Sequence, residues 1–421
     1  MRIFREFWNS YRRRGSLATN KGKIQLVFHT LWLHIHPVKV HNSHFKFTYT
    51  WYLGFISFYL FLILTVTGIA LMFYYRPTTT AAYQDMKDLE FAVFLGKFTR
   101  NLHRWATHAM IIVVVLHMYR VFVTGSYKKP RQLNWVIGVL LLLLTLLLSF
   151  TGYLLPWDQL AFWAITVGAS MGAYTPWLGP KLKELLLGGT QVGDAALIRF
   201  YVLHCIVLPV AMVLLTMLHF WRIRKDGGLS PPPHRLSART VCLAESTAWS
   251  PETDDPRTAL APEKSAAAAA VADEAPPASR PVASKDEDIV FAYPYAFYRE
   301  GIALLATLLV MMAASLVWNA PLEELANPAK TPNPAKAPWY FLGVQEMVSY
   351  SAFVGGVVAP ALMIFALLVL PYLDTSPERR PSKRKLGIWI FSLVLLANAI
   401  FIVIGTYFRG EGWKFVFPWS T

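Results

Sequence analysis

The sequence is poor in cysteine and in acidic side chains. Its 421 residues contain two cysteines, Cys205 in an apolar run and Cys242 in a polar stretch, which excludes a disulfide framework. Aspartate and glutamate number 25 against 40 lysines and arginines, so the formal net charge is +15. The basic N-terminal stretch MRIFREFWNSYRRRG lacks the apolar core and cleavage site of a signal peptide.

Apolar residues are abundant, at 55% of the chain, and the mean hydropathy is +0.39. A bilayer-spanning helix needs about 20 consecutive apolar residues. Seven stretches meet this requirement, and they predict an all-α polytopic membrane protein. The spans are expected at about 50–75, 104–124, 134–155, 200–222, 301–318, 353–371 and 386–408.

The basic residues lie just outside these apolar stretches, as the positive-inside rule describes, and so we expect no nucleic-acid partner. The N-terminus and the loops SYKKPRQLN, RIRKDGG and SPERRPSKRK all fall on one side, the cytoplasmic (n) side. The loops 76–100, 156–199 and 319–352 then fall on the opposite (p) side. This alternation places the N-terminus in the cytoplasm.

Composition divides the chain into four parts. Residues 1–48 mix basic and aromatic side chains, as an n-side segment lying on a membrane surface would. Residues 49–225 hold four spans, and 289–421 hold three. Between them, residues 226–288 are rich in proline and alanine and have few large apolar side chains, so we expect a cytoplasmic linker that forms no core.

Two spans carry matched pairs of histidines. His103 and His117 are fourteen residues apart in HRWATHAMIIVVVLH, and His204 and His219 are fifteen apart in HCIVLPVAMVLLTMLH. At about 100° per residue, each pair returns to within about 40–60° of one helix face. We therefore expect two bis-histidine metal sites stacked across the membrane, which suits haem in electron transfer. His108, on another face, is expected to pack or to form a hydrogen bond.

The two other spans carry glycines with the same period. Gly54 and Gly68 are fourteen residues apart, as are Gly138 and Gly152. Glycine gives a flat cofactor room beside a helix, and its alternative use is close helix–helix packing. The shared period favours the first interpretation.

These features resemble cytochrome b of the Rieske/cytochrome b complexes, which oxidise quinols. The resemblance covers about 45–225 through GIALMFYYRPT, LHRWATH, TGYLLPWDQLAFWA and LHFWRIRKDG. The fifteen-residue step resembles the chloroplast and cyanobacterial branch, and the last three spans resemble that branch's separate small subunit, fused here through the linker.

The resemblance implies a Q-cycle enzyme of a bacterial inner membrane. Quinol would give one electron to a Rieske iron–sulfur protein and the other to two non-covalent b haems, His103/His204 and then His117/His219, that reduce quinone on the n side. A cytochrome c-type subunit and a dimeric multisubunit complex in the lipid bilayer are implied too. Because the chain has no CxxCH motif, and because Tyr52 stands where the chloroplast branch has its haem-attaching cysteine, we expect no covalent haem.

Further residues follow from the resemblance. Arg104 and Arg120 are expected to hold haem propionates, with snorkelling to the membrane surface as the alternative. In YPYAFYRE, Arg299 and Glu300 would bind and protonate quinone on the n side, unless they are ordinary juxtamembrane charges.

The quinol segment departs from the family pattern. Where the family has Pro-Glu-Trp-Tyr, this chain has Ala337-Pro338-Trp339-Tyr340, and proline cannot accept a proton. We expect Glu346 to replace the missing glutamate, with a pKa raised by burial. The alternatives are an interfacial glutamate and membrane-belt roles for Trp339 and Tyr340. Because the usual glutamate is missing, we favour menaquinol as the substrate.

Two other functions compete with this interpretation. A dihaem membrane anchor would pass electrons one way between a dehydrogenase and quinone, but such anchors have about four spans and lack the PWY segment. A transporter could use paired histidines as proton relays, and it would show no b-type haem bands in a reduced spectrum.

Overall fold

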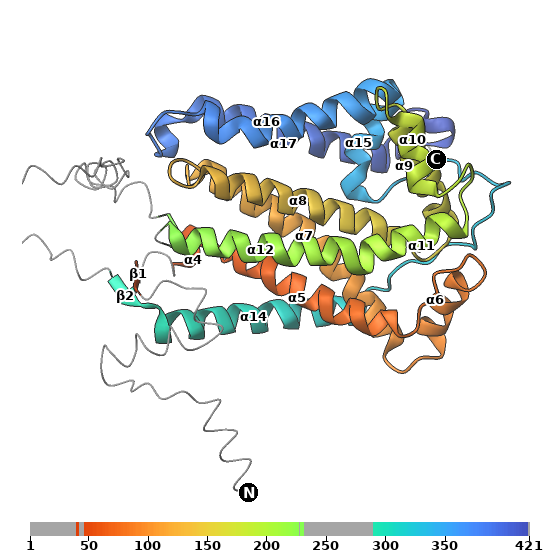
Figure 1. Ribbon diagram of the computed structural model, residues 1–421, viewed down its shortest axis with the longest axis horizontal. Coiled ribbons are helices and arrows are strands. Elements are labelled where there is room, and N and C mark those ends of the chain that lie inside the picture. Colours follow the sequence, from red (N-terminus) through yellow and green to blue (C-terminus); the bar gives the residue numbers. More distant parts are fainter. Residues whose placement is uncertain (1–38, 42–45, 227, 231–288, 420–421) are drawn as a thin grey trace, which may run out of the picture.

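The structure of the protein, a computed structural model, describes residues 39–41, 46–226, 228–230 and 289–419, and Figure 1 shows their arrangement. All seven predicted spans are present as long apolar helices, and the all-α fold is confirmed. They are α5 (Leu53–Met72), α7 (Gly96–Val123), α8 (Gln132–Tyr153), α11 to α12 (Asp194–Lys225), α14 (Ala292–Val317), η4 to α16 (Val354–Leu373) and α17 (Lys385–Tyr407). The predicted surface segment and linker lie almost wholly outside the described residues.

The first four spans form a bundle in which α5 packs on α7 and α8 packs on α12. The last three spans do not gather into one unit. Helix α14 packs on α5 and α7, whereas α16 packs on α8, so in Figure 1 they lie on opposite sides of the bundle. The C-terminal part of the chain therefore packs against two opposite sides of the four-helix bundle.

The two ends of the bundle differ. We call one end the n end. It contains α4 (Phe47–Thr50), the 3-10 turn η5 (Pro381–Lys383) and a small antiparallel pair of β1 (Lys39–His41) with β2 (Ile289–Phe291). At the other end, the p end, lie short helices that the sequence did not predict. They are α6 (Ala82–Phe91), α9 (Gln159–Ala173), α10 (Gly179–Leu187), α15 (Trp339–Tyr350) and the turn η6 (Glu411–Trp413).

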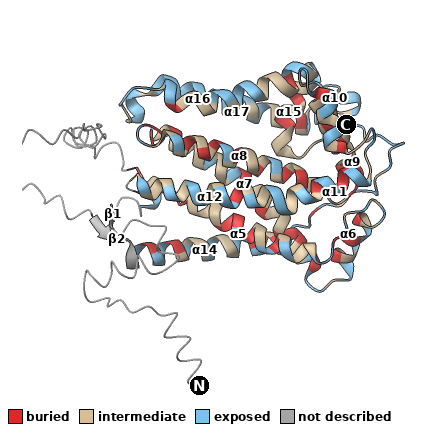
Figure 2. Ribbon diagram, in the orientation of Figure 1, coloured by how far each residue is buried: buried red, intermediate tan, exposed pale blue. Residues whose placement is uncertain are grey.

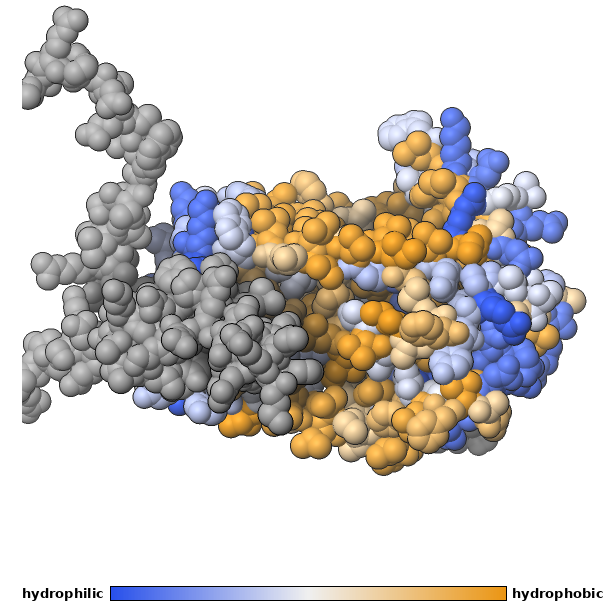
Figure 3. Space-filling view, turned by 60° about the horizontal axis from the view of Figure 1, so that its bottom comes forward, coloured by the Kyte–Doolittle hydropathy of each residue, from blue (hydrophilic) through white to orange (hydrophobic). Residues whose placement is uncertain are grey.

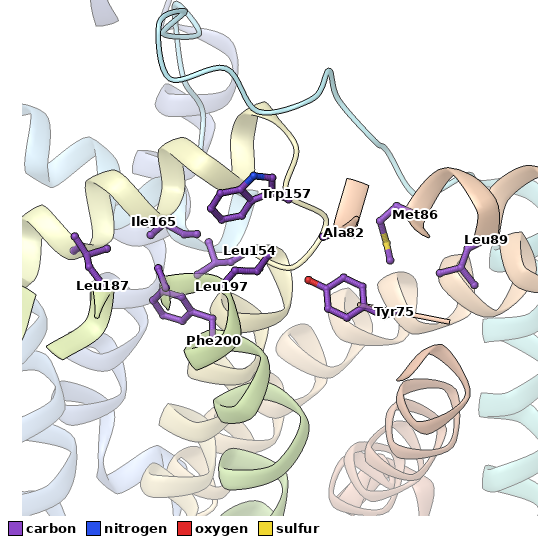
Figure 4. Close-up of a cluster of buried hydrophobic side chains, with 12 residues drawn as sticks. Tyr75, Ala82, Met86, Leu89, Leu154, Trp157, Ile165, Leu187, Leu197 and Phe200 are labelled. Carbon is purple, nitrogen blue, oxygen red and sulfur yellow. The ribbon is translucent and has the colours of Figure 1, made fainter. Parts of the chain in front are cut away.

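Three of the p-end helices, α6, α9 and α10, share a hydrophobic core with α11. Figure 4 shows Ile165 of α9 close to Leu154, Trp157, Leu197 and Phe200. The long helices, in contrast, bury few residues and leave apolar side chains on their outer faces (Figure 2). These side chains form an apolar band between hydrophilic ends in Figure 3, as a bilayer requires.

Two spans contain a wider, π-helical turn. Leu203–Val207 (η2) joins α11 (Asp194–Val202) to α12 (Leu208–Lys225), and Val354–Val358 (η4) precedes α16 (Ala359–Leu373). In each case a proline, Pro209 or Pro360, follows the π turn by two residues. Proline cannot donate the i→i−4 hydrogen bond and its ring crowds that carbonyl, so the wider turn relieves the clash.

The π turn at His204 explains the unequal histidine spacing. In a regular helix, a fourteen-residue step ends about 40° short of a full rotation and a fifteen-residue step about 60° beyond it. A π turn absorbs one extra residue. The fifteen-residue step from His204 to His219 therefore has the rotation of a fourteen-residue α-helical step, and both histidine pairs have the same geometry.

Deletion of Ile206, combined with Pro209→Ala, should convert the π turn to an α turn and keep His204 and His219 on one face. Deletion of Leu215 should leave the π turn in place and rotate the two histidines apart by about 100°. The first variant should bind haem both at His103/His204 and at His117/His219, as measured by reduced-minus-oxidised spectra of purified protein. The second should lose the haem at one of these two sites. Equal spectra from both deletions would contradict this explanation.

Candidate functional site

His103 and His204 face each other across a cavity at the p end. Their ring centroids are 6.2 Å apart, and Gly68, Gly152 and Arg104 line the same cavity. Two metal–nitrogen bonds of about 2 Å each, together with half of each imidazole ring, fill such a separation. The pair is thus placed to bind one metal ion from opposite sides.

Hydrogen bonds fix the orientation of both rings. The Thr67 hydroxyl donates to the Ile63 carbonyl oxygen and lies 2.9 Å from His103 Nδ1, so it accepts the Nδ1–H. His204 Nδ1 lies 3.0 Å from the Leu148 carbonyl oxygen, which can only accept. Both rings therefore carry their proton on Nδ1 and leave the Nε2 lone pair free for a metal.

A second cavity lies at the n end of the same bundle. It is lined by His117 and His219, by Gly54 and Gly138, and by Arg120. The buried Arg120 Nη2 has no hydrogen-bond partner, although Arg120 Nε donates to the Tyr49 carbonyl oxygen at 3.1 Å. A buried guanidinium nitrogen without a partner indicates a place for an anionic group.

The two cavities meet at one layer of side chains. Phe61, Met110, Thr145 and Met212 line both cavities, and each comes from a different helix of the bundle. Phe61, Met110 and Met212 also belong to one buried apolar cluster. The two histidine pairs are therefore stacked along the bundle axis with an apolar partition between them.

The glycines make room for the histidines themselves. A Cβ added at Gly152 would lie 2.5 Å from His204 Cε1, and one added at Gly54 or Gly68 would lie 3.2 Å from Cε1 of His117 or His103. At Gly138 the distance to His219 Cε1 is 3.8 Å, an ordinary contact. Our expectation that all four clear space for a flat cofactor is thus refined, because the nearest neighbours are the imidazole rings.

Gly152→Ala and Gly138→Ala should differ. The first displaces the His204 ring, at a cost of about 1–3 kcal/mol, and should weaken haem binding at the p end about tenfold or more. The second leaves His219 in place. Haem content and the reduced spectrum of each purified variant test this; equal losses in both variants would show that the glycines act on something other than the imidazoles.

Each cavity offers two protein ligands to a metal. Among the described residues, no group of three or more histidine, cysteine, aspartate or glutamate side chains is placed to hold a metal ion. The remaining coordination positions would then come from a cofactor. A haem would meet this requirement, with the two histidines of each cavity holding it, and would supply a one-electron carrier suited to electron transfer.

The quinol segment predicted from APWY lies beside the p-end cavity. Tyr340, in the first turn of α15, lines the cavity, and burial raises its pKa to about 12 despite the opposing charge of Arg104. Trp339 Nε1 donates a hydrogen bond to His108 Nδ1 at 2.7 Å. His108 thus forms a hydrogen bond, as expected, and its partner belongs to the quinol segment.

Glu346 corrects one prediction. Burial alone would raise its pKa, but hydrogen bonds from Arg409, Tyr350 and Trp413, together with the Arg409 charge, outweigh burial and lower it. The fully buried carboxylate forms an ion pair with Arg409 and accepts from Trp413 Nε1 at 3.1 Å and from Tyr350 at 3.0 Å. The expected rise in the pKa of Glu346 is therefore wrong. The local sequence could not show this, because Arg409 comes from a distant part of the chain.

This ion pair fastens the C-terminal segment to α15. If that is its role, Glu346→Gln and Arg409→Gln should both slow quinol oxidation, since breaking a buried pair costs about 3–5 kcal/mol. Both should also speed trypsin cleavage after the already exposed Lys414, because the loosened segment fits the protease more readily. If Glu346 is instead the proton acceptor, Arg409→Gln raises its basicity and should not slow turnover. Glu411→Gln, in the same segment but exposed, is the control.

The remaining predicted residues divide between the two ends. Arg104 lines the p-end cavity, whereas Tyr52 and the buried Glu300 line the n-end cavity with Arg120. Arg299 lies next to Glu300 near the start of α14 and interacts with Tyr52. The structure thus brings Arg104 to one cavity and Tyr52, Arg120 and Glu300 to the other, and their roles there stay predictions.

Comparisons with known proteins give two family matches and several relatives. Residues 38–227 match the family model "Cytochrome b/b6/petB", and 325–417 match "Cytochrome b(C-terminal)/b6/petD". The chain is 42% identical to cytochrome b6 of Heliomicrobium gestii over 47% of this chain and 90% of that protein, and 42% identical to cytochrome b6 of Acaryochloris marina over 42% and 83%.

A solved structure, "Hyperthermophilic respiratory Complex III", resembles the whole fold. Its TM-score is 0.69, with 91% of this chain and 89% of that chain covered, and the sequences are 23% identical. At that identity the likeness concerns the fold.

Proposed function

This chain belongs to the cytochrome b/b6 family, and from that premise we propose that it is the cytochrome b subunit of a quinol-oxidising membrane complex. The observation that carries the proposal is the stacking of two bis-histidine cavities within one bundle of membrane-spanning helices. Two electron carriers stacked along the bundle axis would shorten each electron transfer across a bilayer whose apolar core is about 30 Å thick.

The family implies b-type haems, and the residues present fit two of them. His103 and His204 would hold the p-end haem, and His117 and His219 the n-end haem. The partnerless Arg120 Nη2 and the cavity-lining Arg104 are placed for the propionates. When bound, the haems supply single-electron carriers between a p-side quinol site and an n-side quinone site.

The chain's residues would organise each quinone site. At the p end, α15 presents Tyr340 to the cavity while Glu346 and Arg409 anchor the helix from its other end. At the n end, Glu300 and Arg299 would bind quinone and supply protons, with Tyr52 beside them. Because Tyr52 stands where the chloroplast branch has the cysteine that attaches a third haem, we propose two non-covalent b haems and no covalent haem.

The wider assembly follows from the proposed reaction. A Rieske iron–sulfur protein would take the first electron of quinol, and a cytochrome c-type subunit would take it onward. We propose a dimeric complex in a bacterial inner membrane with the N-terminus in the cytoplasm, where the basic loops also lie. Menaquinol is the substrate that we favour.

The alternative of a one-way dihaem anchor is less well supported. Helices α15, α16 and α17 add a segment that touches the p-end cavity, and a four-span anchor would have no use for it.

The function can be tested with the complex purified from native membranes. A short-chain naphthoquinol should reduce the b haems with oxidant present, and an n-side inhibitor should increase their reduction whereas a p-side inhibitor should prevent it. A short-chain benzoquinol, compared in the same assay, tests the substrate preference. Haem reduction that neither inhibitor changes would contradict a Q-cycle and favour the anchor.

A further inference from the structure

His108 lies where α7 meets α15. It is five residues after His103, so its side chain points about 140° away from the p-end cavity. Trp339 Nε1 is 2.7 Å from His108 Nδ1, and Arg104 Nε is 3.0 Å from His108 Nε2. The ring of Tyr340 lies edge-on to the imidazole, with the centroids 5.8 Å apart.

Both neighbours of the imidazole are hydrogen-bond donors. The indole N–H and the guanidinium N–H groups can only donate, whereas a neutral imidazole has one nitrogen that accepts and one that carries the ring proton. His108 can therefore accept from Trp339 or from Arg104, but not from both at once. The two contacts compete for a single lone pair.

Each hydrogen-bond partner of His108 either lines the p-end cavity or is next to a residue that lines it. Trp339 is the first residue of α15, and its neighbour Tyr340 lines the cavity. Arg104 lines the same cavity from α7. When Trp339 donates to Nδ1, the ring proton must sit on Nε2, which then cannot accept from Arg104. When Arg104 occupies Nε2, the indole is released.

We propose that His108 is a positioning residue that couples Trp339 of the quinol segment to Arg104 of the p-end haem cavity. The role of the quinol segment rests on the proposed function, whereas the effect on Arg104 does not. The coupling links the placement of α15 to the charge beside the haem site, at a position outside both cavities.

Three substitutions separate the two contacts. The carbonyl oxygen of asparagine lies near the position of Nδ1, and that of glutamine lies near the position of Nε2. His108→Asn should therefore keep the Trp339 bond, His108→Gln should keep the Arg104 bond, and His108→Leu should keep neither. The complex from native membranes is used throughout, and an unchanged haem content shows that each variant is folded.

The three variants should differ in two measurements, the KM for quinol and the midpoint potential of the p-end haem. The KM for a short-chain naphthoquinol should rise about tenfold in His108→Leu and His108→Gln, the usual cost of one hydrogen bond, and stay near the wild-type value in His108→Asn. The shorter contact, 2.7 Å, is the one from Trp339, so the wild-type imidazole accepts from the indole and Arg104 is already released. The midpoint potential of the p-end haem should therefore stay near the wild-type value in His108→Leu and His108→Asn, and should fall in His108→Gln, because a bound Arg104 charge then stabilises the reduced form less.

The outcomes are distinguishable from failure of the proposed function. If His108→Leu keeps both wild-type values, or if the asparagine and glutamine variants agree in both measurements, the coupling is overturned. If the wild-type complex oxidises no quinol, the proposed function fails, and the haem potentials alone then decide whether His108 restrains Arg104.

Discussion

Two pairs of opposed imidazoles set the constraints that the rest of this structure meets. An imidazole buried in an apolar bundle is costly unless it has partners, and a metal-ligating ring must also be held in one tautomer. Thr67 and the Leu148 carbonyl oxygen provide this at the p end. The facing helices give up side chains at Gly68 and Gly152 so that the rings fit.

The histidine pairs also explain features of the helices that carry them. The π turn at Leu203–Val207 has a local cause in Pro209, and its effect is to bring His204 and His219 onto one face in spite of their fifteen-residue spacing. The apolar partition of Phe61, Met110, Thr145 and Met212 keeps the two cavities separate while holding them in line. Stacked sites in a membrane bundle follow from these local arrangements.

Much of this was predictable because membrane helices and paired histidines have strong periodic signals. The seven spans, the four histidines and the four glycines follow from apolar length and a period near fourteen. The short p-end helices were missed because their apolar patterns are brief and lie in loops. The placement of α14 apart from α16 and α17 depends on packing that no single segment encodes.

The candidate quinol site shows where sequence reasoning stops. The missing glutamate was visible in APWY, but the pKa of Glu346 depends on Arg409 and Trp413, which are about sixty residues away, and its direction could not be read from local sequence. The contact of His108 with Trp339 likewise joins distant segments.

The number of haems per chain tests the central claim most directly. Acid–acetone extraction of the purified chain, with haem and protein measured on the same sample, should release two non-covalent haems per polypeptide. A ratio of one or zero in a folded preparation would contradict the account of two stacked bis-histidine sites.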